Sequence, residues 1–403
     1  MRIVVTSQHR YARTPDGRVW TDAKYAYSFW RRYLDVFDRV RVVARVRPID
    51  AAPADWQPVT GEGVEVAPLP FVRGAWGWVR NLRAMRSAAR SAIEPRDAVM
   101  LRAPGEVACC VDTWLWKQRR PYGVEVVGDP RELFAPGAVR SPFRPLLRAL
   151  YPRRVRLECA RATCAAYVTR ETLQRSYPPP KAGLSTHYSS IELRDEAFVE
   201  RPRTGVEPIS ESRPGRLLFV GSFGQMYKGP DVAIGALRRC RDAGVPVRLR
   251  MCGDGQHRPE MEAFADRLGV RDSVEFLGQV DSARVRQELD AADVFISPAR
   301  QEGLPRAVIE AFARAAPTVA SNVGGTAELV DEPERIELGS TEAMATALAR
   351  RVIELLRDPP RRERLSARNL AVAAAYHERE LSQRRRRMYE YLRSETEGWV
   401  RGS

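Results

Sequence analysis

The chain has 403 residues, enough for two to three domains with their own cores, and its 44% hydrophobic and 29% charged residues are ordinary for a globular protein. No apolar run approaches the roughly 18 residues of a membrane-spanning helix, and "MRIVVTSQHR" lacks the apolar core of a signal peptide, so we expect neither. The net charge of +15 predicts an anionic partner, which would be nucleic acid, a membrane face or a phosphorylated ligand.

Short β-branched runs alternate with helical patterns along the chain, which predicts βαβ units and parallel sheets. In the first half the predicted strands are 2–6, 40–46, 98–101, 124–127 and 165–169. In the second half they are 216–221, 247–253, 273–278, 293–298 and 318–321, with helices predicted over 230–242, 257–268, 281–291 and 305–316. The predicted fold class is α/β, with two doubly wound domains that face each other across a cleft.

The boundary between the domains is predicted in the polar stretch 201–215, "RPRTGVEPISESRPG", which has neither helical nor strand periodicity. We predict an N-terminal domain over 1–207, a second domain over 208–375, and a C-terminal helix within 376–403 that packs back on the N-terminal domain. In open α/β sheets ligands bind at the carboxyl ends of the strands, so functional residues are expected in the loops that follow them.

Six cysteines are spread along the chain without a C-x-x-C pair, and together with the four histidines they show no zinc-like spacing. This pattern is typical of a reduced, cytoplasmic protein.

The segment "SPARQEGLPRAVIEAFARAAPTVASNVGGTAEL", residues 297–329, carries the strongest functional pattern. Pro305 fits the first turn of a helix whose free N–H groups at 303–307 would attract an anion. Glu302 precedes this helix and Glu310 comes eight residues later, about 12 Å away if all eight are helical. Because a diphosphate separates two sugars by a similar span, each carboxylate is predicted to bind the hydroxyls of one sugar. The alternative is a pair of solvated surface glutamates.

One further residue stands out by its type. The chain has 66 basic residues and only four lysines, and one of these, Lys228, lies in "GSFGQMYKGPD", residues 221–231. An ammonium and a guanidinium are not interchangeable, so Lys228 is either an ordinary surface residue or has a specific anionic partner.

Three motifs of the second half together resemble glycosyltransferase family 4, a retaining family with the GT-B fold of two Rossmann-like domains. They are "LLFVGSFGQMYKGPDVAIGAL" (217–237), "RMCGDGQHRPEMEAFADRLGVRDSVEFLGQV" (250–280) and "EGLPRAVIEAFARAAPTVASNVGGTAEL" (302–329), and they occur in the family's order. The resemblance covers about residues 215–330, whereas the N-terminal half matches loosely.

The resemblance implies a nucleoside diphosphate sugar as donor and assigns residues to its binding. Lys228 would pair with the diphosphate, Glu302 would bind the donor sugar, and Glu310 would hold the ribose. The other positions implied for the donor site are Gly253, Gly255, Gly278, Val280, Gly303 and Leu304. Gly278 to Val280 would contact the base through backbone, while Gly253 and Gly255 either approach the nucleotide or form an ordinary tight turn.

The chain departs from the family at Ser222, which stands where the family often has an arginine for the diphosphate. Arg300 or Arg306 would then supply the missing positive charge. No D-x-D sequence occurs in the chain, which agrees with metal-independent transfer, where basic residues and a helix dipole stabilise the leaving diphosphate. We expect no metal, and no cofactor besides the donor as co-substrate.

The acceptor side is predicted in the first half, where no pattern of a protein nucleophile stands out. This fits the same-face transfer that the resemblance implies. Asp129 follows a predicted strand and either acts as a third catalytic residue beside Lys228 and Glu302 or caps the next helix. A loop over 10–27, with Gly17, would cover the diphosphate or the acceptor. Arg102 is a weaker candidate of the same kind.

Two arginine-rich segments, 71–91 and 143–161, combine basic with large apolar residues, as interfacial amphipathic helices do. Both lie in the predicted acceptor domain and would suit a lipid-linked, anionic acceptor at a membrane surface. The alternative is a solvated arginine-rich face.

We therefore predict a retaining hexosyltransferase that moves a sugar from a nucleoside diphosphate sugar, UDP favoured, to a lipid-linked or cell-surface glycan precursor. It would be cytoplasmic and peripheral on the inner face of the membrane. The alternatives are transfer to a small-molecule natural product and a non-catalytic GT-B protein that binds nucleotide sugars. No nucleic-acid-binding module is recognisable, so we expect no nucleic-acid partner.

Overall fold

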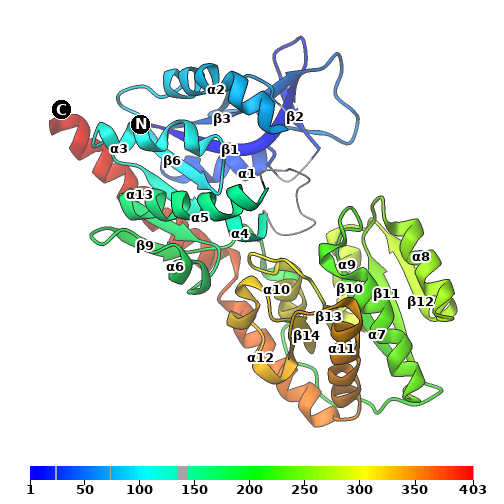
Figure 1. Cartoon of the computed structure of the whole chain (residues 1–403). Helices are drawn as coiled ribbons and strands as arrows, with labels where there is room; N and C mark the ends of the chain where they lie inside the picture. Colours follow the sequence, from blue (N-terminus) through cyan, green and yellow to red (C-terminus); the bar gives the residue numbers. More distant parts are fainter. Residues whose placement is uncertain (23–24, 73, 134–143, 403) are drawn as a thin grey trace. The chain divides into compact units, whose positions relative to one another are not determined.

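The computed structural model describes residues 1–22, 25–72, 74–133 and 144–402. They form two compact α/β units (Figure 1), of which unit 1 comprises Met1–Tyr188 with Ser382–Ser403 and unit 2 comprises Ser189–Leu381. The sequence places its domain limits after 207 and after 375 instead. The segment after Tyr188 groups with unit 2 because Val199 N donates to Ala313 O at 3.0 Å and Arg203 N donates to Ser366 Oγ at 2.7 Å.

Unit 1 is built on a sheet of nine strands among the described residues. Seven strands run in the order β5-β3-β1-β6-β7-β8-β9 with parallel pairing, and β2 and β4 add an antiparallel extension to the end of β1. The five strands predicted for this half are confirmed as β1, β3, β6, β7 and β8. The strands are β1 (Arg2–Arg13), β2 (Val19–Thr21), β3 (Arg39–Pro48), β4 (Gln57–Pro58), β5 (Val64–Leu69), β6 (Ala98–Ala103), β7 (Gly123–Val126), β8 (Cys164–Tyr167) and β9 (Leu184–His187).

β1 is much longer than predicted, so the expected loop over 10–27 is wrong in its first part. The strand shifts register between Thr6 and Arg10 and continues to Arg13 beside β3. The chain then turns through Gly17, at a φ of 85°, into β2. Pairing with β3, which has 10 residues, supplies backbone hydrogen bonds along this extension that the local sequence pattern did not reveal. Lys24, within the same predicted loop, lies outside the described residues.

Helices cover both faces of the unit 1 sheet. The inward residues Met85, Leu115 and Val155 share one core cluster with Val124 and Val126 of β7, which places their helices on one face. Glu125 alternates with these strand residues and therefore faces the opposite side. The first face carries α2 (Gly74–Ser91), α3 (Asp112–Lys117), α5 (Arg144–Arg161) and α6 (Thr172–Ser176), and the second carries α1 (Tyr27–Trp30), η1 (Arg31–Asp35) and α13 (Glu378–Gly402) from Ser382 onward.

A buried ionic cluster centred on Glu125 ties this second face together. Arg102 Nη1 donates to Glu125 Oε2 at 2.5 Å, and Arg32 Nη2 lies 3.5 Å from the same oxygen. Burial works to raise the pKa of Glu125, but the two guanidiniums and tyrosine hydrogen bonds outweigh it and hold that pKa below its ordinary value. Arg102 lies within β6 and not after it, and is 6% exposed, while its role on the acceptor side stays a prediction. Hydroxyls from three separate elements also donate to Glu125: those of Tyr33, Tyr188 and Tyr389.

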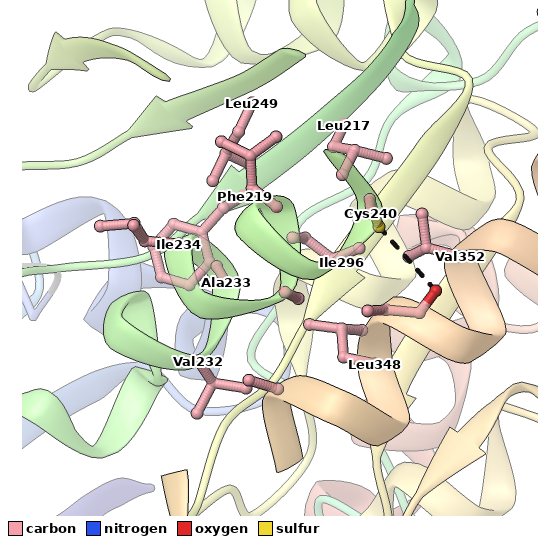
Figure 2. Packing of buried hydrophobic residues seen from close by; sticks show 14 of the residues in the cluster. Leu217, Phe219, Val232, Ala233, Ile234, Cys240, Leu249, Ile296, Leu348 and Val352 are labelled. Atoms are coloured by element: carbon pink, nitrogen blue, oxygen red, sulfur yellow. Dashed lines mark hydrogen bonds between the residues drawn. The ribbon is translucent and has the colours of Figure 1, made fainter. Parts of the chain in front are cut away.

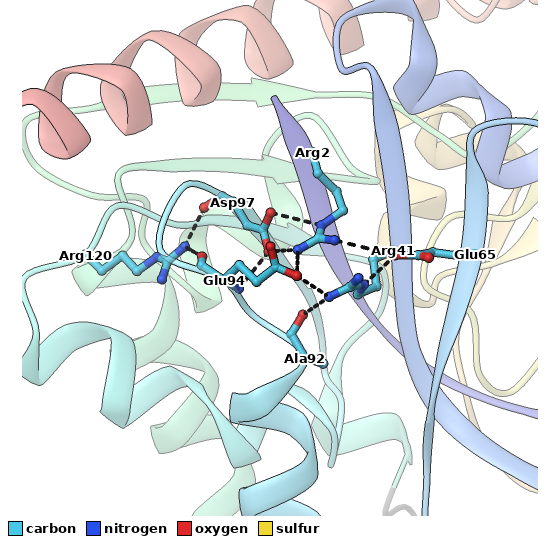
Figure 3. A network of polar contacts seen from close by, with 7 residues as sticks. All are labelled: Arg2, Arg41, Glu65, Ala92, Glu94, Asp97 and Arg120. Atoms are coloured by element: carbon cyan, nitrogen blue, oxygen red, sulfur yellow. Dashed lines mark hydrogen bonds and ion pairs between the residues drawn. The ribbon is translucent and has the colours of Figure 1, made fainter.

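A second ionic network holds the amino ends of the central strands (Figure 3). Arg2, the first residue of β1, donates to Asp97 at 2.9 and 2.8 Å and pairs with Glu94 at 2.7 Å. Arg120 Nη2 donates to the backbone carbonyls of Glu94 and Asp97, each at 2.6 Å. These contacts connect the amino ends of the strands to the loop before β6. Ligands of such sheets bind at the opposite edge, where the carboxyl ends of the strands lie.

Unit 2 is a parallel sheet of six strands in the order β12-β11-β10-β13-β14-β15. The five strands and four helices predicted here are confirmed to within three residues at their ends, whereas β15, α11 and α12 were not predicted. Within the described residues, no helix of the protein has both the length and the apolar content to cross a membrane. The elements are β10 (Gly215–Val220), α7 (Pro230–Asp242), β11 (Val247–Cys252), α8 (Arg258–Arg267), β12 (Val274–Gly278), α9 (Ser282–Ala291), β13 (Val294–Ser297), α10 (Arg306–Ala313), β14 (Thr318–Ser321), β15 (Arg335–Ile336), α11 (Thr341–Leu356) and α12 (Pro359–Ala374).

The core of unit 2 lies between this sheet and the pair of helices α7 and α11 (Figure 2). Pro230 starts α7 directly after Gly229, and apolar residues then recur every three to four positions, as at Ala233, Leu237 and Cys240. Cys240 points toward α11, with its Sγ 3.9 Å from the carbonyl oxygen of Ala349. This packing fixes the start of α7, and with it the preceding segment that contains Lys228.

The Glu125 cluster yields a stability prediction. Glu125→Gln keeps the shape of the side chain but leaves Arg102 buried without its counter-charge, so we expect a loss of roughly 3 kcal/mol or more in the free energy of unfolding. Glu65→Gln is the control, because Glu65 is paired with Arg41 at 53% exposure and should cost less than about 1 kcal/mol. Urea unfolding of both variants measures this, and equal losses would contradict it.

Candidate functional site

The predicted donor-site residues follow the carboxyl ends of the unit 2 strands, which all meet at one edge of the parallel sheet. Ser222 follows β10, Gly253 follows β11, Gly278 ends β12, and Glu302 follows β13. The structure therefore brings these loops, separated in the sequence, to one side of unit 2. We call this edge the candidate donor site.

The loop after β13 carries Glu302 into helix α10. The helix begins at Arg306, and Pro305 is its N-cap, with its carbonyl accepting from Val308 N at 3.1 Å and Ile309 N at 3.3 Å. Residues 302–305 are therefore not helical, so the estimate of about 12 Å between Glu302 and Glu310 does not apply. Only the stretch from Arg306 to Glu310 rises helically, by about 6 Å.

Lys228 and Glu302 form an ion pair between the loops after β10 and β13. Nζ of Lys228 donates to Oε1 of Glu302, and the two side chains are 26% and 15% exposed. The ammonium also lies 5.4 Å from the centre of the Tyr227 ring. Both side chains thus remain reachable by a ligand, and the ammonium offsets a carboxylate that would otherwise repel a phosphate.

Arg300 holds the segment that carries Lys228. Its Nη1 and Nη2 donate to the two carboxylate oxygens of Asp231 at 2.9 and 2.7 Å, and Nη1 also donates to the carbonyl of Met226 at 3.0 Å. Its backbone N donates to Tyr227 O at 2.6 Å, and Nη2 donates to Thr341 Oγ1 at 2.8 Å. The guanidinium is thus engaged inside unit 2, at the base of η4 (Met226–Lys228).

Two glycines allow the close backbone approaches on which the Lys228–Glu302 pair depends. A Cβ at Gly229, whose φ is 76°, would lie 2.1 Å from the carbonyl oxygen of Pro298. A Cβ at Gly324, whose φ is 53°, would lie 1.8 Å from the carbonyl oxygen of Glu302. Both positions therefore require glycine on grounds of space as well as backbone conformation.

Glu310 and Arg306 lie one turn apart on α10. Burial raises the pKa of Glu310 above its ordinary value, and the positive charge of Arg306 opposes that shift. Burial likewise lowers the pKa of Arg306, against the attraction of Glu310. Neither side chain has a hydrogen-bond partner in the part of the chain that the structure describes, so both are available to a ligand.

The loops after β10 and β11 pack against each other through backbone. Ser222 Oγ accepts from Gly224 N at 3.0 Å, so its hydroxyl folds back on its own loop. Added Cβ atoms at Gly253 and Gly255 would lie 2.0 Å from Gly221 O and 2.2 Å from Gly224 N. Both glycines thus have a role within the fold, and their contact with a nucleotide stays a prediction.

The backbone strip predicted for the base lies at the end of β12. Gly278 O accepts from Gly253 N at 2.8 Å, whereas Val280 N–H and C=O have no partner among the described residues. The N–H groups of Gly303 and Leu304 also lack a partner there, although Gly303 O accepts from Gly325 N at 2.7 Å. These free backbone groups agree with the contacts that the resemblance implies.

The residues predicted for the acceptor side lie in unit 1. Asp129 caps α4 (Pro130–Leu133), since its Oδ1 accepts from Arg131 N at 2.8 Å, and it also accepts from the Tyr177 hydroxyl. The helix-cap alternative is thus realised, and a catalytic role for Asp129 stays a prediction. Gly17 lies at the turn of the β1–β2 hairpin, with no atom within 4 Å of where its Cβ would be.

The sequence reasoning missed two groups of residues. Asp231 and Thr341 accept hydrogen bonds from Arg300. Asp231 could have been noticed in the sequence, because an acidic residue three positions after Lys228 is a candidate partner for a nearby arginine. In unit 1, Gln8 Nε2 donates to Glu106 Oε2 at 2.7 Å and Arg45 pairs with Glu106 at 3.2 Å, where β1 shifts register. No local sequence pattern predicts the contacts of Gln8, Arg45 and Glu106, because these residues come from β1, from β3 and from the loop after β6.

Comparison with known proteins shows similarity to glycosyltransferases over the part of the chain that carries the candidate donor site. Residues 207–371 match the family described as glycosyl transferases group 1. The chain is 25% identical over 309 residues to protein CapJ of Staphylococcus aureus, covering 76% of each protein. It is 35% identical over 160 residues to the putative colanic acid biosynthesis glycosyltransferase WcaL of Escherichia coli K12, covering 38% of this chain and 37% of that one. Among solved structures, Anabaena Alr3699/HepE in complex with UDP and glucose superposes with a TM-score of 0.63 at 16% identity, over 96% of this chain and 98% of that chain.

The fold is therefore that of the GT-B glycosyltransferases, with two Rossmann-like α/β units. The matched family covers the sheet and loops of the candidate donor site. Residues 207–371 thus resemble the glycosyl transferases group 1, and the relatives share this resemblance over all or part of their length.

The close approach at Gly324 yields a prediction. Gly324→Ala must displace the Glu302 loop, so we expect it to lower stability and to abolish any stabilisation by UDP. Gly244→Ala is the matched control, because Gly244 has a φ of 68° but nothing within 4 Å of its Cβ position. The control should cost only the left-handed backbone penalty of about 1 kcal/mol. Thermal unfolding with and without UDP tests both, and a UDP response retained by Gly324→Ala would contradict the assignment.

The raised pKa of Glu310 yields a second prediction. An acid whose pKa is higher in the folded than in the unfolded protein lowers stability as the pH rises from the unfolded value through the folded one. Glu310→Gln should therefore be at least as stable as the wild type at pH 7.5, and its relative advantage should shrink toward pH 4. Unfolding midpoints of both proteins across this range measure it. A variant clearly less stable at pH 7.5 would show that the carboxylate is not penalised by burial.

Proposed function

We propose that the protein is a retaining glycosyltransferase that uses a nucleoside diphosphate sugar, with UDP as the favoured nucleotide. The observation that carries this proposal is the Lys228–Glu302 pair beside the start of α10, with Glu310 on the same helix. In this proposal the Lys228 ammonium and the free backbone N–H groups bind the phosphates of the ligand. The two carboxylates accept hydrogen bonds from the hydroxyls of its sugars.

The donor is assigned to these residues in order. Lys228 and the first N–H groups of α10 hold the diphosphate, Glu302 binds the transferred sugar, and Glu310 accepts from the ribose hydroxyls. The free backbone N–H and C=O of Val280 face the base. On binding, the Lys228 ammonium exchanges part of its contact with Glu302 for phosphate oxygens, and this frees Glu302 for the sugar.

Arg306 supplies the second positive charge that Ser222 cannot. Arg300 is engaged by Asp231, Thr341 and Met226, so we assign it the positioning of the Lys228 segment. Arg306 stands at the first position of α10 and has no hydrogen-bonded partner among the described residues. Its charge adds to the helix dipole at the same point.

The transfer follows a same-face course. The bond between the sugar C1 and the diphosphate oxygen breaks, the acceptor oxygen bonds to C1 on the same face, and the acceptor proton passes to the departing phosphate. The negative charge that develops on the diphosphate is stabilised by Lys228, Arg306 and the N–H groups of α10, with no metal involved. No protein nucleophile takes part.

The acceptor that we propose is a lipid-linked or cell-surface glycan precursor, in keeping with the name of the colanic acid relative. Asp129 and Gly17 belong to the acceptor side in this proposal. The protein would work in the cytoplasm, on the inner face of the membrane. All six cysteines are free, which fits a reducing compartment.

Nucleotide binding is the first test. UDP, GDP, ADP and TDP are added to the wild type and to Lys228→Ala, Glu310→Ala and Arg306→Ala, with Lys181→Ala as the control for loss of a lysine. One nucleotide at about a hundred times its Kd should stabilise the wild type and the control by about 2.7 kcal/mol. The three site variants should lose most of this gain. A wild type that responds to no nucleotide, or a Lys228→Ala that responds fully, would overturn the donor assignment.

The retaining course is tested on the bound donor. Slow hydrolysis of the sugar nucleotide is followed by NMR before the released sugar mutarotates. Retention of the anomeric configuration is expected. Inversion would show that the same-face course is wrong while leaving the donor site intact, and the absence of any turnover with intact nucleotide binding would favour a non-catalytic binding protein.

A further inference from the structure

Large apolar side chains gather on three helices of unit 1. Among the described residues, eight large apolar side chains are exposed, and six of these lie on α2, α3 and α5. On α2, Trp76 is 72% and Val79 is 67% exposed. Single exposed apolar residues are normal, but a group on adjoining elements marks an interaction surface. The six are Trp76, Val79, Trp116, Leu146, Leu150 and Leu157.

The three helices cover the same face of the unit 1 sheet, because their inward residues share one core cluster. On α2, Trp76 and Val79 lead into Arg80, Arg83 and Arg86, all exposed and spaced by three or four residues along one helical stripe. Arg73 and Phe143, which belong to the two arginine-rich segments of the sequence, lie outside the described residues.

The same surface carries charge of one sign. The three helices contain eleven arginines and lysines, whereas their only acidic residues, Asp112 and Glu158, are 7% and 2% exposed. Within the described chain, Arg80, Arg83 and Arg86 have no ion-pair partner, so their charges are not neutralised by the protein itself. The outward surface of α2, α3 and α5 therefore carries basic, apolar and uncharged polar groups, and no exposed acid.

We propose that this surface, hereafter the α2–α5 surface, binds the anionic face of a lipid bilayer. Tryptophan and leucine side chains insert at the level of the headgroups, while the arginines contact lipid phosphates. A protein partner would need acidic groups opposite the arginines of three helices and apolar groups opposite the side chains between them. An anionic bilayer offers both kinds of group everywhere on its surface. The proposal commits to anionic lipid as the occupant.

The surface also suits the acceptor in the proposed function, and this part rests on that function. α2 follows β5 and α5 precedes β8, so the amino ends of both helices lie at the carboxyl edge of the unit 1 sheet. Trp76, Val79, Leu146 and Leu150 all lie in the first two turns of these helices. Asp129 follows β7 at the same edge. A glycan carried on a lipid would thus be presented where the acceptor residues are predicted.

Vesicle binding of the full chain, without any donor, tests the surface directly. Vesicles of equimolar phosphatidylglycerol and phosphatidylcholine are compared with phosphatidylcholine alone by co-sedimentation. Arg80→Gln, Arg83→Gln and Arg86→Gln are combined in one variant. Because each basic residue near the surface contributes roughly a fivefold gain in binding, the variant should bind the anionic vesicles about a hundredfold more weakly. The wild type should bind them strongly and pure phosphatidylcholine weakly.

The matched control removes three other exposed arginines of unit 2, which lie on α11, at its C-cap and on α12. Arg350→Gln, Arg357→Gln and Arg364→Gln change the net charge equally and should keep binding within a few-fold of the wild type. Equal losses in the two triple variants would overturn the proposal, since binding would then follow net charge alone. A wild type that does not bind anionic vesicles would overturn it as well.

A second variant tests the apolar part, with Trp76→Ser, Val79→Ser, Leu146→Ser and Leu150→Ser combined. We expect at least a tenfold loss of vesicle binding, most evident at high salt, where the arginines are screened. Light scattering of the wild type and this variant distinguishes self-association, because a dimer that the variant dissociates would make the surface an interface between copies and overturn the lipid assignment. If the variant fails to unfold cooperatively, the arginine comparison decides alone.

The failure of this inference and that of the proposed function can be told apart. Vesicle binding with no nucleotide response would leave the lipid surface standing and remove the donor assignment. A nucleotide response without vesicle binding would do the reverse, and would direct the search for the acceptor to water-soluble molecules.

Discussion

The contact between Lys228 and Glu302 joins two loops 74 positions apart, and the candidate donor site depends on it. Neither loop could bring its charge there alone. Gly229 lets the Lys228 segment pass against Pro298, and Gly324 lets the next loop pass against Glu302. Arg300 then fixes the Lys228 segment through Asp231 from inside unit 2. A cation and an anion thus meet at partial exposure, where each stabilises the other and both stay open to a ligand.

The main ionic cluster of unit 1 is buried, unlike the Lys228–Glu302 pair of unit 2. Its central carboxylate, Glu125, is buried with arginines and tyrosines from elements that include the C-terminal helix α13. Burial of a charge is tolerated only when counter-charges and hydrogen bonds surround it, and here all are supplied by the protein. The cluster therefore organises the unit, and the Glu125 carboxylate has all its partners within the protein. Arg102 illustrates the contrast with Lys228, because Arg102 lies within β6 beside a buried carboxylate, whereas Lys228 lies in a loop beside a partly exposed one.

The surface of unit 1 shows a third arrangement, in which charge is left without a partner. Among the described residues Arg80, Arg83 and Arg86 of α2 have no ion-pair partner, and the exposed Trp76 and Val79 lie on the same helix. In a chain of net charge +15 such arginines are numerous, so their number means little. Their position beside exposed apolar residues, on one face of one sheet, is what distinguishes a docking surface from ordinary solvation.

The sequence by itself determined the fold class, ten of the strands and the motifs of the candidate donor site, because these depend on local periodicity and on spacing within single loops. Glu302, Glu310 and Lys228 could be named from such patterns. Tertiary structure alone decided what no local pattern encodes. It extended β1 far beyond the predicted strand through pairing with β3 and began α10 four residues after Glu302. It also gave the Arg300 guanidinium hydrogen-bond partners, whereas Arg306 has none within the described part of the chain. It also buried Arg102 against Glu125. Each of these outcomes depends on partners distant in the sequence, since burial and pairing arise only when separate elements pack together.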